Sequence, residues 1–138
     1  MKRGVTVDLA PALDILRREL PQLEGVYLFG SAAVGANRTD SDVDLAFLAG
    51  RPIDRHRTLV IQEQIAKALF RDVDLVDLAA APTILQIQII GEGRVVDAPD
   101  PDAVAFFEVR VFRDYQELKA RRSELEAEIV QRGRVYGR

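Results

Sequence analysis

The chain has 138 residues, a formal net charge of −3, no cysteine and 48% hydrophobic residues. This composition excludes a mainly disordered chain, disulfides and cysteine-based zinc sites. The sequence contains no run of about 18 apolar residues, so no membrane span is predicted. The negative net charge disfavours a general nucleic-acid binder. The chain starts without the apolar stretch of a signal peptide, so we expect a cytoplasmic protein with neither a membrane nor a direct nucleic-acid partner. We expect one domain, residues 1–138, with its core at about 8–98.

The first helix is predicted to start at Asp8 as its N-cap and to end near Leu20, before Pro21. An apolar run from Gly25 to Phe29 then predicts a buried strand. Gly30-Ser31 ends this strand, and a glycine lets the backbone turn sharply and approach a phosphate closely. Ser31 is a favoured N-cap, so a short helix can start there with its free N–H groups pointing at an anion.

Two carboxylates follow ten residues after this turn, on a second predicted strand. Asp42 and Asp44 alternate with Val43, Leu45 and Phe47, so both point to one face, roughly 7 Å apart. Two such carboxylates repel each other unless a cation lies between them. Mg²⁺ prefers oxygen ligands and is often shared between carboxylates and phosphates. An Asp-x-Asp motif alone is most often a solvated turn. The spacing between this motif and Gly30-Ser31 instead favours a nucleotide and metal site.

A third carboxylate lies on a further strand, which follows a helix predicted from about residues 52–54 to Phe70. Asp74 is flanked by Val73 and Leu75, and a carboxylate inside an apolar strand is costly unless something compensates it. We therefore choose Asp74 as the third site residue. The alternative is that Asp74 pairs with an arginine such as Arg71 or Arg94. Because a helix joins the Asp42 and Asp74 strands, a crossover connection is expected.

The rest of the chain predicts two helices and an edge strand. Residues 82–90 fit either a strand, by alternation, or a helix between Pro82 and Gly91. Residues 94–97 predict a short edge strand. The longest helix is expected from about residue 101 to 132, with Gly133 as its stop signal. Its apolar stripe runs past the domain's own core, which indicates either a solvated tail or a surface for another protein.

The three carboxylates together suggest a two-metal phosphoryl-type transfer. Asp42 and Asp44 would bridge the ions, while Asp74 would hold one of them or accept the proton of an attacking hydroxyl. The attack would fall on the α-phosphorus of a nucleoside triphosphate, with pyrophosphate leaving.

These motifs resemble the signature of the DNA polymerase β-like nucleotidyltransferase superfamily, and more narrowly the minimal nucleotidyltransferase (MNT) family. The resemblance covers roughly residues 26–118 and rests on four stretches, residues 29–35, 41–46, 72–78 and 90–94. It implies an α/β (α+β) nucleotidyltransferase fold, with a small mixed sheet flanked by helices and a long C-terminal helix. It also favours a helix for residues 82–90.

The resemblance also implies a function. MNT proteins act as antitoxins of HEPN-domain toxins and transfer AMP from ATP to a tyrosine hydroxyl of the toxin. We therefore expect Mg²⁺ and ATP as cofactors and a HEPN toxin as partner in a hetero-oligomer. The predicted catalytic and metal-binding residues are Asp42, Asp44 and Asp74, and the predicted nucleotide-binding residues are Gly30, Ser31, Arg38 and Ser41.

The chain departs from the family pattern at one place. Many relatives carry arginines in the helix after the Gly-Ser turn, where this chain has Ala32 and Val34. Arg38 is the candidate replacement for steadying the triphosphate. The departure motivates an alternative function, a catalytically weak or inactive antitoxin that neutralises its partner by binding. Transfer of AMP to a small molecule such as an aminoglycoside is a third option, disfavoured because so short a chain leaves little room for an acceptor domain.

Overall fold

The computed structural model describes residues 7–30 and 42–136, and its centre is a four-stranded mixed sheet. The strands are β1 (Leu23–Phe29), β2 (Val43–Ala49), β3 (Val73–Asp77) and β4 (Arg94–Asp97). Their order is β3-β2-β1-β4. β1 is antiparallel to both β2 and β4, whereas β2 and β3 run parallel. The short edge strand expected at residues 94–97 is therefore confirmed.

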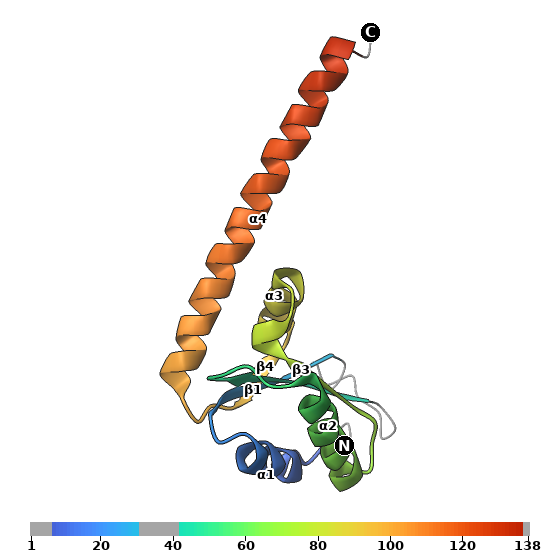
Figure 1. Cartoon of the computed structure of the whole chain (residues 1–138), viewed down its shortest axis with the longest axis vertical. Coiled ribbons are helices and arrows are strands. Elements are labelled where there is room, and N and C mark those ends of the chain that lie inside the picture. The colour runs from blue at the N-terminus through green and yellow to red at the C-terminus, as the bar shows by residue number, and fades with distance from the viewer. Residues whose placement is uncertain (1–6, 31–41, 137–138) are drawn as a thin grey trace, which may run out of the picture.

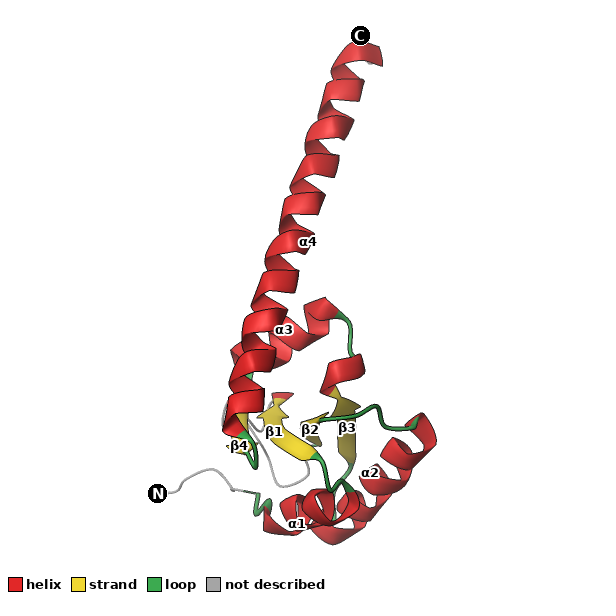
Figure 2. Cartoon of the chain, turned by 60° about the vertical axis from the view of Figure 1, so that its left-hand side comes forward, coloured by secondary structure: helices red, strands yellow, loops and turns green. Residues whose placement is uncertain are grey.

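Helices cover both faces of the sheet (Figures 1 and 2). One face carries α1 (Ala10–Glu19) and α2 (Arg55–Leu69). The other carries the short 3-10 helix η2 (Leu78–Ala80), α3 (Thr83–Glu92) and α4 (Pro101–Tyr136). The predicted architecture, a small mixed sheet flanked by helices with a long C-terminal helix, is confirmed.

Successive side chains of the strands point to opposite faces of the sheet and form two separate apolar cores. Odd-numbered residues of β2 and β3 pack under α1 and α2, in a core that includes Val43, Leu45, Phe47, Val73 and Leu75. Even-numbered residues point to the other face, where Ala46, Leu48 and Val76 pack with α3 and α4. Asp44 and Asp74 are even-numbered residues of the same strands, so the alternation of side chains places both on the α3 and α4 face.

The connection from β2 to β3 is the predicted helical crossover. α2 leaves after β2 and returns the chain to a parallel strand, as two parallel strands require. The Gln62 side chain on α2 accepts a hydrogen bond of 2.8 Å from the Leu75 N–H. This contact satisfies a donor of the edge strand β3 and fixes α2 along it.

Three predicted helix ends are wrong, each for a local reason. Asp8 is not the N-cap of α1: the helix begins at Ala10 with Leu9 as N-cap, although the Asp8 carboxylate accepts a hydrogen bond from the Ala10 N–H. Gly91 lies inside α3, and Gly93 is the C-cap. Gly133 lies inside α4, because a glycine costs a helix only about 1 kcal/mol and does not end it. The helix assignment for residues 82–90 is confirmed.

No helix in the described ranges contains a segment that is both long and apolar enough to cross a membrane.

Candidate active site

Asp44 and Asp74 lie side by side on two neighbouring strands. In the parallel register of β2 and β3, Asp44 is the direct partner of Asp74. Neighbouring strands are about 4.8 Å apart, so the two carboxylates leave the same face of the sheet at nearly the same place. Asp44 is half-buried and Asp74 is exposed. Two residues that are 30 positions apart in the sequence thus form one acidic pair.

Gly30 adjoins this pair from β1. Phe29 is the antiparallel partner of Asp44, so the turn that follows β1 begins beside the Asp44 side chain. Gly30 has a φ of +74°, which L-residues with a side chain rarely adopt. A Cβ on this residue would lie 2.2 Å from Oδ2 of Asp44. The glycine is therefore required both by its backbone conformation and by the space that the carboxylate occupies.

The electrostatics at Asp44 show how closely the carboxylates interact. Burial raises the pKa of Asp44, and the negative charges of Asp74 and then Asp42 raise it further. Asp42 is exposed and comes immediately before β2. The three predicted carboxylates thus act on one another, and the most buried of them gains most from a cation. Arg94, one candidate partner of Asp74, forms no ion pair with it among the described residues.

The remaining predicted nucleotide-binding residues, Ser31, Arg38 and Ser41, lie outside the described residues, as do Ala32 and Val34. Their roles stay predictions. Of the predicted set, the structure brings together Gly30, Asp42, Asp44 and Asp74.

The acidic pair fits a magnesium ion that a substrate also coordinates. In the described ranges, no group of three or more histidine, cysteine, aspartate or glutamate side chains could by itself hold a metal ion. Mg²⁺ in nucleotide enzymes keeps several waters and takes only one or two carboxylates together with phosphate oxygens. Asp44 and Asp74 would supply the two carboxylates, whose mutual repulsion a cation would relieve. The backbone turn at Gly30 lies close enough for phosphate oxygens to complete the coordination.

A cavity of about 420 Å³ adjoins Asp74 along the outer edge of β3. α2 and the segment before it supply one wall, with Ile53, Arg55, Thr58, Leu59 and Gln62. The acidic pair is therefore open on the side of Asp74 to a space large enough for a side chain of another molecule.

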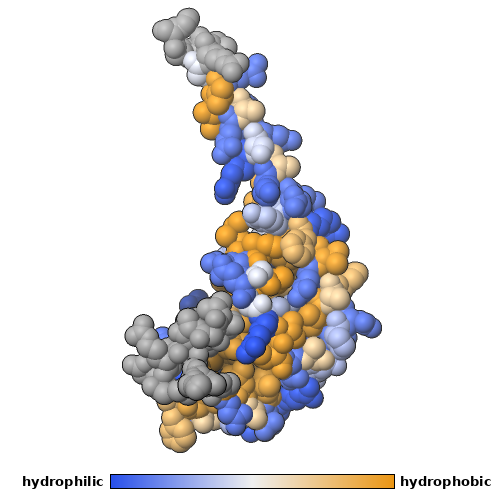
Figure 3. Space-filling model, turned by 180° about the vertical axis from the view of Figure 1, so that it is seen from behind, coloured by the Kyte–Doolittle hydropathy of each residue, from blue (hydrophilic) through white to orange (hydrophobic). Residues whose placement is uncertain are grey.

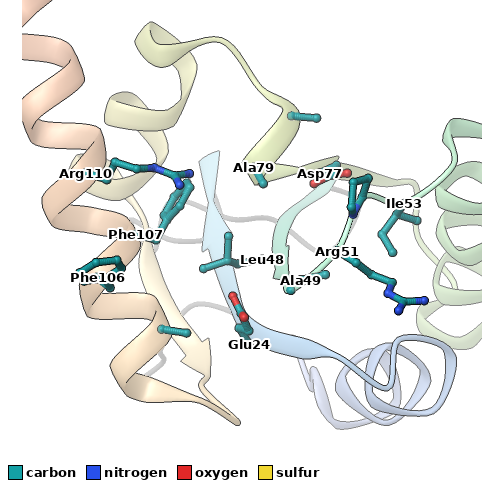
Figure 4. A pocket seen from close by; sticks show the side chains of 14 residues that line it. Glu24, Leu48, Ala49, Arg51, Ile53, Asp77, Ala79, Phe106, Phe107 and Arg110 are labelled. Carbon is teal, nitrogen blue, oxygen red and sulfur yellow. The ribbon is translucent and has the colours of Figure 1, made fainter.

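A second groove, of about 550 Å³, lies at the other end of the sheet (Figure 4). Phe106, Phe107 and Arg110 of α4 line one side, while Arg51, Ile53 and Asp77 line the other. Leu48 of β2 is in this groove, four residues beyond Asp44. Four strand residues span about 13 Å, so this groove is separate from the acidic pair. No motif in the sequence marks it, because its residues come from four distant segments.

Residues 13–102 match the family model described as polymerase beta, nucleotidyltransferase. The chain belongs to this nucleotidyltransferase family. The matched segment contains Gly30 and all three carboxylates, and it ends at the first turn of α4.

Individual relatives of this nucleotidyltransferase are also known. It is 35% identical to the protein adenylyltransferase MntA of Shewanella oneidensis over 113 residues, which cover 82% of this chain and 81% of that protein. A toxin–antitoxin crystal structure with AMP-PNP contains a chain of similar fold, with a TM-score of 0.75 and 34% identity, covering 86% of this chain and 94% of that one.

A further structure contains a tri-AMPylated HEPN toxin of Shewanella oneidensis in complex with an MNT antitoxin. Its match has a TM-score of 0.70 and 31% identity, and it covers 86% of this chain and 92% of the matched chain. The expected membership of the MNT family is confirmed by these relatives.

Proposed function

We propose that this nucleotidyltransferase is a protein adenylyltransferase that transfers AMP from ATP to a tyrosine hydroxyl of a partner HEPN toxin. It thereby acts as the antitoxin of that toxin. The observation that carries the proposal is the juxtaposition of Gly30, Asp44 and Asp74 on one face of the sheet. The relatives named above include an adenylyltransferase and an antitoxin in complex with an AMPylated toxin. Because ATP is the donor, the proposal places the reaction in the cytoplasm.

The reaction forms a bond between the acceptor oxygen and the α-phosphorus and breaks the bond from that phosphorus to the pyrophosphate. Asp74 is exposed beside an open cavity, so it is the residue placed to accept the proton of an incoming hydroxyl. Gly30 leaves room for the triphosphate to approach the backbone at the end of β1. With the nucleotide at Gly30 and the toxin hydroxyl at Asp74, the site would hold donor and acceptor close together, which is the main contribution a protein makes to such a transfer.

Asp44 and Asp42, with Asp74, would hold Mg²⁺. When bound, the ion supplies positive charge that neutralises the phosphates and the carboxylates and makes the attacking hydroxyl more acidic. Burial raises the pKa of Asp44, and Asp74 and Asp42 raise it further, so these side chains accept a divalent cation rather than a second anion. Ser31, Arg38 and Ser41 are proposed to contact the nucleotide.

The test is intact mass spectrometry of the proposed partner, a HEPN toxin, after incubation with the protein, ATP and Mg²⁺. We expect the mass to rise by one or more AMP units, and we expect Asp44→Asn to abolish the increase while still binding the toxin. Glu63→Gln, an exposed change on α2, serves as the matched control and should transfer AMP like the wild type. An unmodified toxin in a stable complex would overturn the proposal and support neutralisation by binding alone.

A further inference from the structure

The outer half of α4, residues 116–133, projects from the body of the molecule without contact to it (Figures 1 and 2). The body covers the helix only as far as Tyr115, which is half-buried, and every residue from Gln116 to Gly133 is exposed. Among them are large apolar side chains, of which Leu125 is 53% and Ile129 is 66% exposed. An isolated helix in water has little stability of its own, so such a segment gains most from a partner.

The apolar residues of this segment follow a seven-residue repeat that starts in the core. Val111, Leu118 and Leu125 occupy one position of the repeat, and Tyr115, Arg122 and Ile129 occupy the other. These are the a and d positions of a coiled coil, and the charged residues Arg122 and Arg132 also fall on them. Figure 3 shows apolar residues recurring among charged ones along the projecting helix. The repeat predicts that another helix packs along this stripe.

The place where the folded domain packs on α4 decides whether the second helix runs parallel or antiparallel to it. Val111 belongs to the stripe and is buried in the core that α4 forms with α3 and the sheet. Two parallel copies would bring both bodies against the same stretch of helix, where they would collide. Two antiparallel copies place the bodies at opposite ends and bring the two outer halves together.

The charges beside the stripe select the partner and the register. With Leu118 of one helix facing Ile129 of the other, the flanking positions bring Arg121 next to Glu128 and Lys119 next to Glu126. Two-fold symmetry repeats both pairs, so four pairs of opposite charge form. A shift by one heptad in one direction instead places Arg121 against Arg121 and Lys119 against Lys119. A shift in the other direction places Glu128 against Glu128 and Glu126 against Glu126, so both shifted registers bring like charges together. The favoured register spans about residues 115–132, nearly the same stretch that the body leaves exposed.

We propose that the outer half of α4 binds a second copy of this chain as an antiparallel two-helix coiled coil. The chain thereby forms a two-fold dimer with its two acidic sites at the distant ends of the helix pair. The partner is a second copy, because the sequence beside the stripe is complementary to itself.

Sedimentation equilibrium of the full-length chain alone tests the proposal. We expect a reversible monomer–dimer equilibrium. Arg121→Glu should weaken dimerisation by about tenfold, since it converts two attractive pairs into repulsive ones. Glu128→Arg should do the same, and the double variant R121E/E128R should restore the wild-type dissociation constant. Glu124→Arg, which lies off the stripe on the same helix, is the control and should have little effect.

The orientation is tested by disulfide trapping, which is clean because the chain has no cysteine. An equimolar mixture of Leu118→Cys and Ile129→Cys should form a cross-linked dimer on oxidation, whereas either variant alone should not. Cross-linking of Leu118→Cys alone would contradict the antiparallel arrangement. A chain that stays monomeric at all concentrations, or a double variant no better than the single ones, would overturn the proposal. If the same substitutions instead weaken toxin binding without rescue by R121E/E128R, the toxin covers this surface.

Discussion

At the scale of single residues, the acidic site depends on one glycine. Gly30 combines a positive φ with a position where any Cβ would lie within 2.2 Å of the Asp44 carboxylate. Asp44 in turn is the residue whose pKa responds to both neighbouring carboxylates. The site therefore has little freedom to adjust to a substitution at either residue.

We expect Gly30→Ala to lower the rate of AMP transfer by about a hundredfold, because the new methyl group displaces the Asp44 carboxylate by about an ångström. It should also lower the free energy of unfolding by about 1–2 kcal/mol through the strained φ. Gly91→Ala is the control, since a Cβ there meets nothing within 4 Å. Toxin AMPylation and thermal unfolding measure the two effects, and an active Gly30→Ala variant would argue against phosphate binding at this turn.

The raised pKa of Asp44 has a consequence for stability. The folded state holds the Asp44 proton more tightly than the unfolded chain does. The stability that this group contributes is therefore present at low pH and is lost as pH rises through its folded pKa. Asp44→Asn removes the charge, so we expect this variant to unfold at a higher temperature than the wild type at pH 7.5 without Mg²⁺. The difference should shrink toward pH 4, and Mg²⁺ should reduce it at pH 7.5. A variant less stable than the wild type at pH 7.5 would contradict this account.

At the scale of elements, the end of α4 that lies on the sheet is fixed by one polar contact in an apolar interface. The Tyr27 hydroxyl of β1 donates a hydrogen bond to the Glu108 carboxylate of α4. Burial raises the pKa of Tyr27, and the hydrogen bond to Glu108 adds to this effect. Val104, Phe107 and Val111 surround the contact. Tyr27 is three residues before Gly30, so the helix and the acidic site share a strand.

We expect Tyr27→Phe to lower the free energy of unfolding by about 1–2 kcal/mol, because it leaves the half-buried Glu108 without its donor. Glu108→Gln keeps an acceptor oxygen and should cost less than Tyr27→Phe. Chemical denaturation of the two variants and of their combination, as a double-mutant cycle, measures the coupling. A coupling energy near zero would show that apolar packing alone holds α4.

The end of α3 is decided by contacts between distant segments and not by the local sequence alone. Of the glycines near the end of α3, Gly93 rather than Gly91 ends the helix. A Cβ on Gly93 would lie 2.7 Å from the backbone oxygens of Ile89 and Leu28, so strand β1 requires a glycine there. The sequence contains both glycines, and only the neighbouring strand distinguishes them.

At the scale of the whole molecule, the sheet separates two surfaces with different features. One end presents Gly30, Asp44 and Asp74, while the groove lined by Arg51, Phe107 and Arg110 lies at the other end. α4 extends far beyond both (Figure 1). A protein that modifies a partner thus has surface for contact well outside the reacting groups.

The sequence by itself determined the strands, the crossover and the three carboxylates. Alternation and the Gly-Ser to Asp-x-Asp spacing are local patterns, and burying an apolar face forces one register on each strand. Only the tertiary structure decided that Asp74 is the direct neighbour of Asp44, that Gly30 touches the Asp44 carboxylate, and that Gly133 continues α4. The physical reason is that these features depend on contacts between segments distant in sequence, whereas periodicity and turn residues report only on neighbours along the chain.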